Sequence, residues 1–161
     1  MKITDVEVVV VRQDNVKMIG DGSQDTAVVL VHTDEGITGI GEVLKAQNPD
    51  IKIWAVEPEN AAILAGGTVS AHIQMGIGDG LIPPVLNTKI FEDVCIISDE
   101  EALQTAKDMA RLEGIMCGIS SGTNVAAAIK LAKELGKGKT VVTVLPDTAE
   151  RYFSTPLFDG E

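Results

Sequence analysis

The sequence predicts an α/β fold: a mainly parallel sheet with flanking helices, to which an N-terminal antiparallel β-hairpin is added. From Ile51 onward, short apolar runs alternate with amphipathic stretches, the pattern of repeated strand and helix units. Before that point, runs of β-branched residues are separated by polar, glycine-bearing segments. With 161 residues and 45% hydrophobic side chains, the chain can bury one core, so we expect a single domain over residues 1–161.

The N-terminal part of the chain is expected to supply the hairpin. Residues 3–12 and 25–33 are rich in β-branched side chains, which favours two strands, and the polar residues 13–24 favour a loop between them. The sequence Thr-Asp-Glu-Gly at 33–36 is typical of a tight turn, with a glycine available for positive φ. We therefore expect an antiparallel meander of two or three strands in the first third of the chain.

The segment that follows this turn is compatible with two structures. Residues 37–44 fit a third strand of the meander, whereas residues 41–46, followed by Gln-Asn-Pro, fit a short helix that stops before Pro49. Propensity alone does not choose between them. Because the next strand must enter the sheet in parallel and needs a crossover connection, we expect residues 41–48 to be helical.

Downstream of this segment, the pattern predicts four strands and two long helices. The expected strands are residues 52–57, 93–97, 115–117 and 140–145. Ser98, followed three residues later by Glu101, forms a capping box that opens a helix to about Glu113. A second helix is expected from Gly122 to Leu135, where Gly136 ends it. The side chains expected to face the core are Ala102, Ala106, Met109 and Ala110 of the first helix and Val125, Ala128, Ile129 and Ala132 of the second.

Composition argues against several classes of partner. With 13 basic and 24 acidic residues, the net charge of −11 repels nucleic acids and anionic membrane surfaces, so neither is expected as a partner. Cys95 and Cys117 lie in apolar surroundings, so we expect both to be buried and reduced, as in a cytoplasmic protein. Residues 1–15 fit neither a signal peptide nor a membrane span. His32 and His72 have no acidic or cysteine partner at ligand spacing, so no metal site is expected.

Two segments carry polar groups where an α/β sheet binds ligands. The sequence Gly-Ile-Ser-Ser-Gly at 118–122 places two hydroxyls and several backbone N–H groups at a helix N-terminus, a site for an anion or a heteroaromatic nitrogen. The simpler interpretation is that Ser120 or Ser121 only caps that helix. Asp147 and Thr148 follow the last strand, either as site residues or as a turn.

The glycine-rich stretch at residues 66–84 is expected to be a loop. It either faces a ligand or wraps around the domain, and the sequence leaves this open. Within it, the sequence Gly-Ile-Gly-Asp-Gly at 76–80 resembles part of a dinucleotide fingerprint. No strand precedes it, so this interpretation is rejected.

Five long stretches of the chain follow one another in the order found in a known family. They are TGIGEVLKAQNPDIKIWAVEPE, GIGDGLIPPVLNT, VCIISDEEA, ARLEGIMCGISSGTNVAAAIKLAKELGKGKTVVTVLPD and ERYFSTPLFD. Together they resemble the C-terminal part of cysteine synthase (O-acetylserine sulfhydrylase), a pyridoxal-phosphate (PLP) enzyme of the tryptophan synthase β fold type. The resemblance begins at about residue 38 and implies that residues 44–161 form a cysteine-synthase-like βαβ segment.

This resemblance implies roles for several residues. Ser120 matches the serine that hydrogen-bonds the pyridine nitrogen of PLP, and Pro146 and Asp147 match the strand end beside the ring. In that family a lysine of an N-terminal domain holds PLP as a Schiff base beside an asparagine-bearing substrate loop, and neither motif occurs in this sequence. The resemblance therefore implies one wall of a pocket and no catalytic residue. The loop that closes over the substrate is matched by Gly76, Ile77 and Gly78.

The phosphate side of the implied site is altered. In the family, a glycine-threonine loop that cradles the cofactor phosphate precedes the helix that resembles TGIGEVLK. Here residues 33–37, Thr-Asp-Glu-Gly-Ile, stand in its place, and their two acids oppose a phosphate. We therefore expect no bound cofactor, or at most weak binding of PLP.

The first 43 residues do not fit the beginning of that family. MKITDVEVVVVR and DTAVVLVHTDEGITGIGEV resemble instead the N-terminal capping segment of enolase-superfamily enzymes related to mandelate racemase. The two resemblances overlap at residues 37–43, which implies a chimera, a recombined or engineered chain with an enolase-like hairpin at 1–43. Such a hairpin would cover the edge of the sheet with antiparallel strands.

Three functions follow as expectations. The first is a folded chimera without native cysteine synthase activity, because the lysine motif is missing. The second is a residual or newly selected PLP-dependent lyase or β-replacement activity on cysteine or O-acetylserine, which the retained Ser120 region supports. The third is an interaction module. Apolar surface left by an absent lysine-bearing domain would also favour a homodimer.

Overall fold

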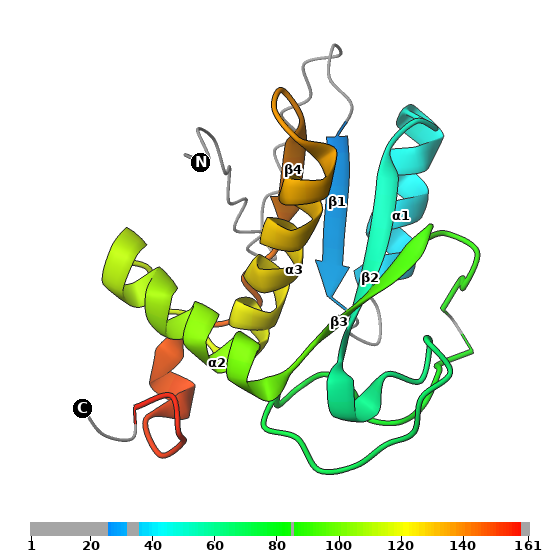
Figure 1. Cartoon of the computed structure of the whole chain (residues 1–161). Helices are drawn as coiled ribbons and strands as arrows, with labels where there is room; N and C mark the ends of the chain where they lie inside the picture. The colour runs from blue at the N-terminus through cyan, green and yellow to red at the C-terminus, as the bar shows by residue number, and fades with distance from the viewer. Residues whose placement is uncertain (1–25, 32–35, 85, 159–161) are drawn as a thin grey trace.

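A parallel sheet forms the centre of the molecule. The computed structural model describes residues 26–31, 36–84 and 86–158, and within them the sheet has four strands in the order β3-β2-β1-β4 (Figure 1). The strands are β1 (Thr26–Val31), β2 (Lys52–Pro58), β3 (Asp93–Ile97) and β4 (Thr140–Thr143). The helices are α1 (Gly36–Gln47), α2 (Asp99–Asp108) and α3 (Ile119–Leu135), with helical turns η1 (Glu59–Ala61), η2 (Met109–Glu113) and η3 (Ala149–Tyr152). The predicted α/β class and the mainly parallel sheet are confirmed.

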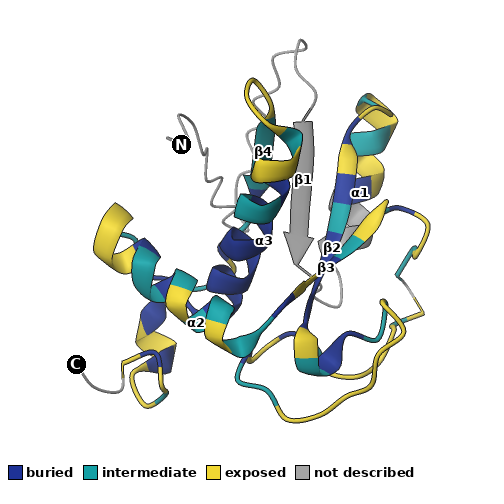
Figure 2. Cartoon of the chain, in the orientation of Figure 1, coloured by how far each residue is buried: buried dark blue, intermediate teal, exposed yellow. Residues whose placement is uncertain are grey.

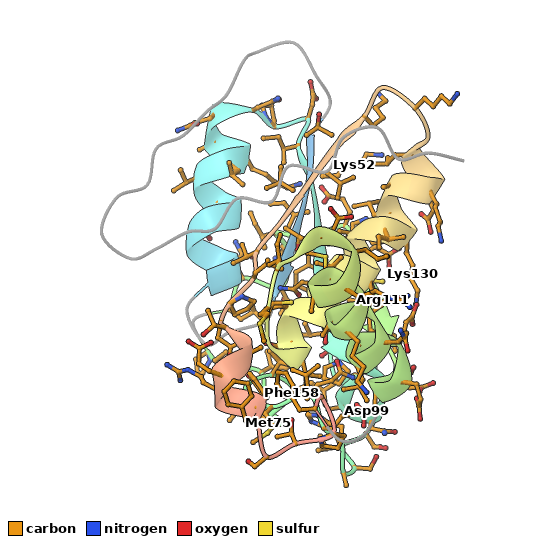
Figure 3. The ribbon with its side chains drawn as sticks, turned by 90° about the vertical axis from the view of Figure 1, so that its left-hand side faces the viewer. Lys52, Met75, Asp99, Arg111, Lys130 and Phe158 are labelled. Carbon is orange, nitrogen blue, oxygen red and sulfur yellow. The ribbon has the colours of Figure 1, made fainter. Side chains whose placement is uncertain are left out.

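Helices cover both faces of this sheet. Seen from the side, α1 lies on one face, and α2 and α3 lie on the other (Figure 3). Alternate side chains of β2 point to opposite faces of the sheet. Ile53 and Ala55 pack with Leu44 of α1, whereas Val56 belongs to the core formed with α2 and α3. A strand that is buried on both faces has a nearly continuous apolar sequence, and this is why the pattern predicted β2 well.

β1 is a central strand of the sheet. It pairs in parallel with β2 on one side and with β4 on the other. The expectation that residues 25–33 belong to an antiparallel hairpin is therefore wrong, because parallel neighbours occupy both edges of the strand. The expected strand at 3–12, the loop at 13–24 and the turn residues 33–35 lie outside the described ranges.

The segment that the sequence left open is helical. α1 spans Gly36–Gln47, and the N–H group of Asn48 donates to the carbonyl of Leu44 at 2.8 Å in the turn before Pro49. The expected helix at 41–48 is confirmed, although it begins already at Gly36, inside the expected turn. The reason is topological, because two adjacent parallel strands, β1 and β2, require a crossover between them.

The start of α2 confirms the predicted cap. The hydroxyl of Ser98 accepts a hydrogen bond from the N–H group of Glu101 at 3.2 Å. Three of the four side chains expected in the core are buried, but Ala110 is exposed. At Met109–Glu113 the helix widens into a π-helical turn, which rotates Ala110 away from the face that a regular 3.6-residue period predicts.

Two expected strand boundaries are corrected by the structure. Residues 115–117 are not a strand, because Cys117 makes only an isolated antiparallel bridge to Thr148. β4 ends at Thr143, before the expected end at Leu145. An apolar run of three residues carries no periodicity, so its sequence does not distinguish a strand from the entry to a buried helix.

The first ten residues of α3 are all buried (Figure 2). The helix begins at Ile119, earlier than the expected Gly122, and it ends before Gly136 as predicted. It lies between the sheet and α2, so both of its sides are covered. Gly122 permits this close packing, since a Cβ atom at this position would lie 2.1 Å from the carbonyl oxygen of Ala102 in α2.

Candidate functional site

The strand order indicates a candidate ligand site at one edge of the sheet. α1 leads from β1 to β2 on one face, and α3 leads to β4 on the opposite side of β1, so the chain order reverses between β1 and β4. In open parallel sheets, ligands bind outside the carboxyl ends of the strands at such a switch point. Here the N-terminus of α3 and the segment after β4 border that position.

The structure brings Ser120 and Asp147 together at this edge. The N–H group of Gly118 donates to the carbonyl oxygen of Asp147 at 3.2 Å, and the Ser121 hydroxyl donates to the same oxygen at 3.4 Å. Gly118 is the N-cap of α3, and no side chain caps this helix. The interpretation of Ser120 or Ser121 as a simple cap is therefore wrong. Ser120 is buried in the first turn of α3, 4% exposed.

Tyr152, which the sequence reasoning did not assign to the site, is hydrogen-bonded to Asp147. Its hydroxyl donates to Oδ2 of Asp147 at 2.6 Å, and the Ser120 side chain acts weakly to lower the pKa of this tyrosine. Burial, followed by the hydrogen bond and charge of Asp147, raises the pKa of Tyr152 to about 12. Tyr152 lies in the ERYFSTPLFD stretch of the resemblance, but the sequence does not reveal that this segment folds back onto α3.

Asp147 is packed tightly against the N-cap of α3. A Cβ atom at Gly118 would lie 2.2 Å from Oδ1 of Asp147 and 2.5 Å from Cε2 of Tyr152, so only glycine fits there. Oδ1 is buried and has no hydrogen-bond partner within the described part of the chain. Pro146 and Thr148, on either side of Asp147, are exposed at the same edge.

Other chemistry-bearing side chains have structural surroundings. Cys95 and Cys117 are buried and free, as expected, and burial, followed by the charge of Asp147, raises the pKa of Cys117 to about 11. A thiol with this pKa is protonated at neutral pH and is a poor nucleophile. His72 is half-buried with Nε2 3.4 Å from the carbonyl of Gly78, and His32 lies outside the described ranges. Within those ranges, no three His, Cys, Asp or Glu side chains form a metal-binding group, and no helix is long and apolar enough to cross a membrane.

The predicted glycine-rich loop at 66–84 is present without a helix or strand, and it runs along the end of β2. A Cβ atom at Gly78 would lie 2.9 Å from Cγ of Pro58, and Ile77 is buried. In Figure 3, Met75 lies at the end of the molecule opposite Lys52, which begins β2. The structure thus places Gly76 to Gly78 at the same edge as Ser120, but beside β2, where the loop lines a shallow hollow with the end of that strand.

Gln74, a residue that sequence reasoning missed, ties this loop to the helices. Its side chain is fully buried, and Nε2 donates to the carbonyl of Ile97 at 3.0 Å and to Oδ1 of Asp99 at 2.9 Å. Its Oε1 accepts from the Thr123 hydroxyl at 2.8 Å. One side chain therefore links the loop to the beginnings of both α2 and α3. A single glutamine in a loop carries no sequence signal of such a role.

We expect Gln74→Leu to lower the free energy of unfolding by about 1–3 kcal/mol, because leucine fills similar space but leaves the part-buried carboxylate of Asp99 and the buried hydroxyl of Thr123 without this partner. Urea denaturation measures the change, and hydrogen exchange in residues 66–84 should accelerate. Gln104→Leu is the matched control, since that amide is exposed and donates only to the nearby Asp108. Equal unfolding midpoints for the two variants would contradict the role of Gln74.

Comparison with known proteins identifies the family. Residues 7–147 match the family described as "Pyridoxal-phosphate dependent enzyme", and the chain belongs to this family. The match includes most of residues 1–43, so it lends no support to an enolase-superfamily segment or to a chimera. The cysteine-synthase-like part of the resemblance is confirmed.

Individual relatives agree with this assignment. The cysteine synthase of Staphylococcus aureus strain Mu50 is 47% identical over 134 residues, which are 83% of this chain and 43% of the relative. A structure of O-ureido-L-serine synthase superposes with a TM-score of 0.80 and 38% identity, over 85% of this chain and 43% of that one. O-acetyl serine sulfhydrylase isoform 3 from Entamoeba histolytica gives 0.81 and 36%, over 87% of this chain and 42% of that one. The chain thus spans less than half the length of these relatives.

Proposed function

We propose that this chain carries the ring-nitrogen side of a PLP site of the cysteine synthase type, and that these 161 residues alone do not catalyse cysteine synthesis. The position of Ser120 carries the proposal: it is buried in the first turn of α3, at the carboxyl edge of the sheet. The named activities of the relatives, a cysteine synthase and an O-acetyl serine sulfhydrylase, support cysteine or O-substituted serines as the substrate class.

The described residues fit one side of the cofactor. Ser120 would face the ring nitrogen, and Pro146 and Asp147 would lie beside the ring. Oδ1 of Asp147 is buried and has no hydrogen-bond partner in the described part of the chain, which supports a role for this carboxylate beside the ring. The loop at 76–78 would face the substrate across the sheet edge. When bound, PLP supplies an electron sink for reactions at the α-carbon of an amino acid.

The residues on the phosphate and lysine side of the site support the second part of the proposal, that this chain alone does not catalyse cysteine synthesis. The acids Asp34 and Glu35 occupy the place of the phosphate loop, and the family's lysine motif does not occur in this sequence. None of the lysines within the described ranges is buried. Lys45 pairs with Glu92, and Lys130 pairs with Glu101 at 2.8 Å, so both side chains already have an acidic partner.

A second candidate function is a residual or newly selected lyase or β-replacement activity, supported by the intact ring-nitrogen side. A homodimer or an interaction module has only the exposed apolar side chains of Leu112, Met116 and Phe153 in its favour. The free, buried cysteines support a cytoplasmic location. A chimeric origin of residues 1–43 stays a hypothesis, and the family match from residue 7 argues against it.

The deciding experiment is a titration of the chain with PLP, followed by borohydride reduction and peptide mapping. We expect weak binding, labelling spread over several exposed lysines, and no formation of cysteine from O-acetylserine and sulfide. Ser120→Ala should leave this diffuse labelling unchanged, as should Ser154→Ala, a matched control at an exposed serine. The contrary result is one dominant labelled lysine, with binding lost in Ser120→Ala and retained in Ser154→Ala. It would contradict the proposed inactivity and favour the residual PLP-dependent activity.

A further inference from the structure

The glycine-rich loop at 66–84 contains an aspartate followed by a glycine, and both residues are exposed. Within the described ranges, the N–H group of Gly80 donates no hydrogen bond, and the carboxylate of Asp79 has no hydrogen-bond or ion-pair partner. Both residues line the shallow hollow beside the end of β2, and neither belongs to a helix or strand. The carboxyl group and the nitrogen that follows it are therefore available to react with each other.

The residue after an aspartate decides how easily its nitrogen reaches the carboxyl carbon. A side chain at that position shields the nitrogen and restricts the backbone, whereas glycine has no Cβ and adopts conformations that other residues avoid. Gly80 already has a φ of +78°, in the left-handed region. Asp79 is the only aspartate within the described ranges that precedes a glycine. The two groups are neighbours in one chain, so ring closure between them needs no encounter between molecules.

We propose that Asp79 is a modification site at which the folded chain converts aspartate to isoaspartate through a cyclic succinimide. The nitrogen of Gly80 forms a bond to Cγ of Asp79, and the carboxyl hydroxyl leaves with the hydrogen of that nitrogen as one water molecule. Water then opens the ring. Cleavage of the new N–Cγ bond restores aspartate, whereas cleavage of the bond between the nitrogen and the main-chain carbonyl carbon leaves isoaspartate. The net change is an isomerisation that consumes no co-reactant, so it is independent of the proposed PLP site.

Other aspartates of the chain lack this combination of features. The N–H group that follows Asp108 donates to carbonyl groups within the helix, where the backbone is held in one conformation. The N–H group of Ile51, which follows Asp50, donates to the carbonyl of Asn48 at 3.2 Å. In both cases the nitrogen already has a partner, and the residue that carries it has a side chain. Asp79 is therefore the position at which we expect the reaction.

The product changes the backbone of a closely packed part of the loop. In isoaspartate the main chain runs through the side-chain methylene, which adds one carbon between Gly78 and Gly80. A Cβ atom at Gly78 would lie 2.9 Å from Cγ of Pro58, and one at Gly80 would lie 2.8 Å from Cγ2 of Val69, so neither flank has room to spare. One of these contacts must shift to accommodate the added atom. Hydrogen exchange in residues 66–84 should therefore be faster in the modified chain than in the unmodified chain.

The test is incubation of the folded full chain at neutral pH in water enriched in heavy oxygen, followed by peptide mapping. Fragmentation by electron transfer distinguishes isoaspartate from aspartate. We expect isoaspartate at position 79 that carries one oxygen from the solvent. Asp79→Glu should abolish this product, because the corresponding ring is larger and closes more slowly. Asp50→Glu, the matched control at an exposed aspartate that precedes Ile51, should leave it unchanged.

The chain unfolded in urea is the reference for the effect of the fold. We expect a rate of isoaspartate formation at position 79 that stays constant with urea up to the onset of unfolding, which circular dichroism on the same samples locates. Isoaspartate that forms at this position only in the unfolded chain would overturn the proposal. So would a rate that rises with the unfolded fraction below the transition, because the reaction would then pass through global unfolding.

Discussion

Replacing Gly122 with alanine is expected to lower the free energy of unfolding by about 1–3 kcal/mol, the usual range for overpacking a core. The new Cβ would lie 2.1 Å from the carbonyl oxygen of Ala102 and 2.8 Å from the backbone nitrogen of Ala106. Both are backbone atoms of α2, so no rotamer change relieves the clash. The helices must separate, and α3 then loses the packing that buries its first ten residues.

The sign of this effect is informative, because helix propensity acts against it. Alanine is favoured over glycine inside a helix by about 1 kcal/mol, and without the clash the substitution would stabilise the protein. Urea denaturation of the variant measures the balance. Lys133→Ala, at an exposed position of the same helix, is the control and should stay within about 0.5 kcal/mol of wild type. A Gly122→Ala variant as stable as wild type would show that α2 and α3 are not packed as closely as described.

Gly118→Ala is expected to damage the site and the fold together. The added Cβ would lie 2.2 Å from Oδ1 of Asp147 and 2.5 Å from the ring of Tyr152. The carboxylate must move, and its hydrogen bond to the tyrosine hydroxyl is lost. The pKa of Tyr152 should therefore fall from about 12 towards the ordinary tyrosine value of 10.0, with the part caused by burial remaining, and tyrosinate absorbance follows this change directly. The free energy of unfolding should also fall by about 1–3 kcal/mol.

A double-mutant cycle separates the clash between a Cβ at position 118 and the Asp147 carboxylate from other effects of Gly118→Ala on stability. In an Asp147→Ala background the carboxylate is absent, so Gly118→Ala should be less destabilising than it is in wild type. Additive losses in the cycle would mean that Gly118 does not act through Asp147. The ring of Tyr152 remains in either background, so part of the destabilisation should persist.

Local features of the sequence predicted much of the fold. β2 and β3 were recognised because both are short apolar runs, and the start of α2 was recognised because Ser98 and Glu101 interact within one turn. The end of α3 at Gly136 and the helix before Pro49 follow from backbone restrictions of those residues. All of these signals act over a few residues, so they are readable without knowledge of the partner segments.

The direction of β1 was decided by tertiary structure. Its β-branched sequence is equally compatible with a hairpin and with a central parallel strand, and the choice depends on β2 and β4, which lie far along the chain. Residues 115–117 are similar: they do not join the sheet, and Ile115 and Cys117 pack against the core while Met116 is exposed.

The candidate site, like the fold, was predicted in part by the sequence and decided in part by the tertiary structure. The sequence by itself determined the family, the position of Ser120 at a helix start and the position of Asp147 after a strand. It did not reveal that Ser120 lies inside the helix, that Tyr152 donates a hydrogen bond to Asp147, or that Gln74 ties the loop to both helices. Only the tertiary structure decided these contacts, because hydrogen bonds between distant side chains depend on how separate elements pack, whereas caps, turns and apolar periodicity depend on neighbours in the chain.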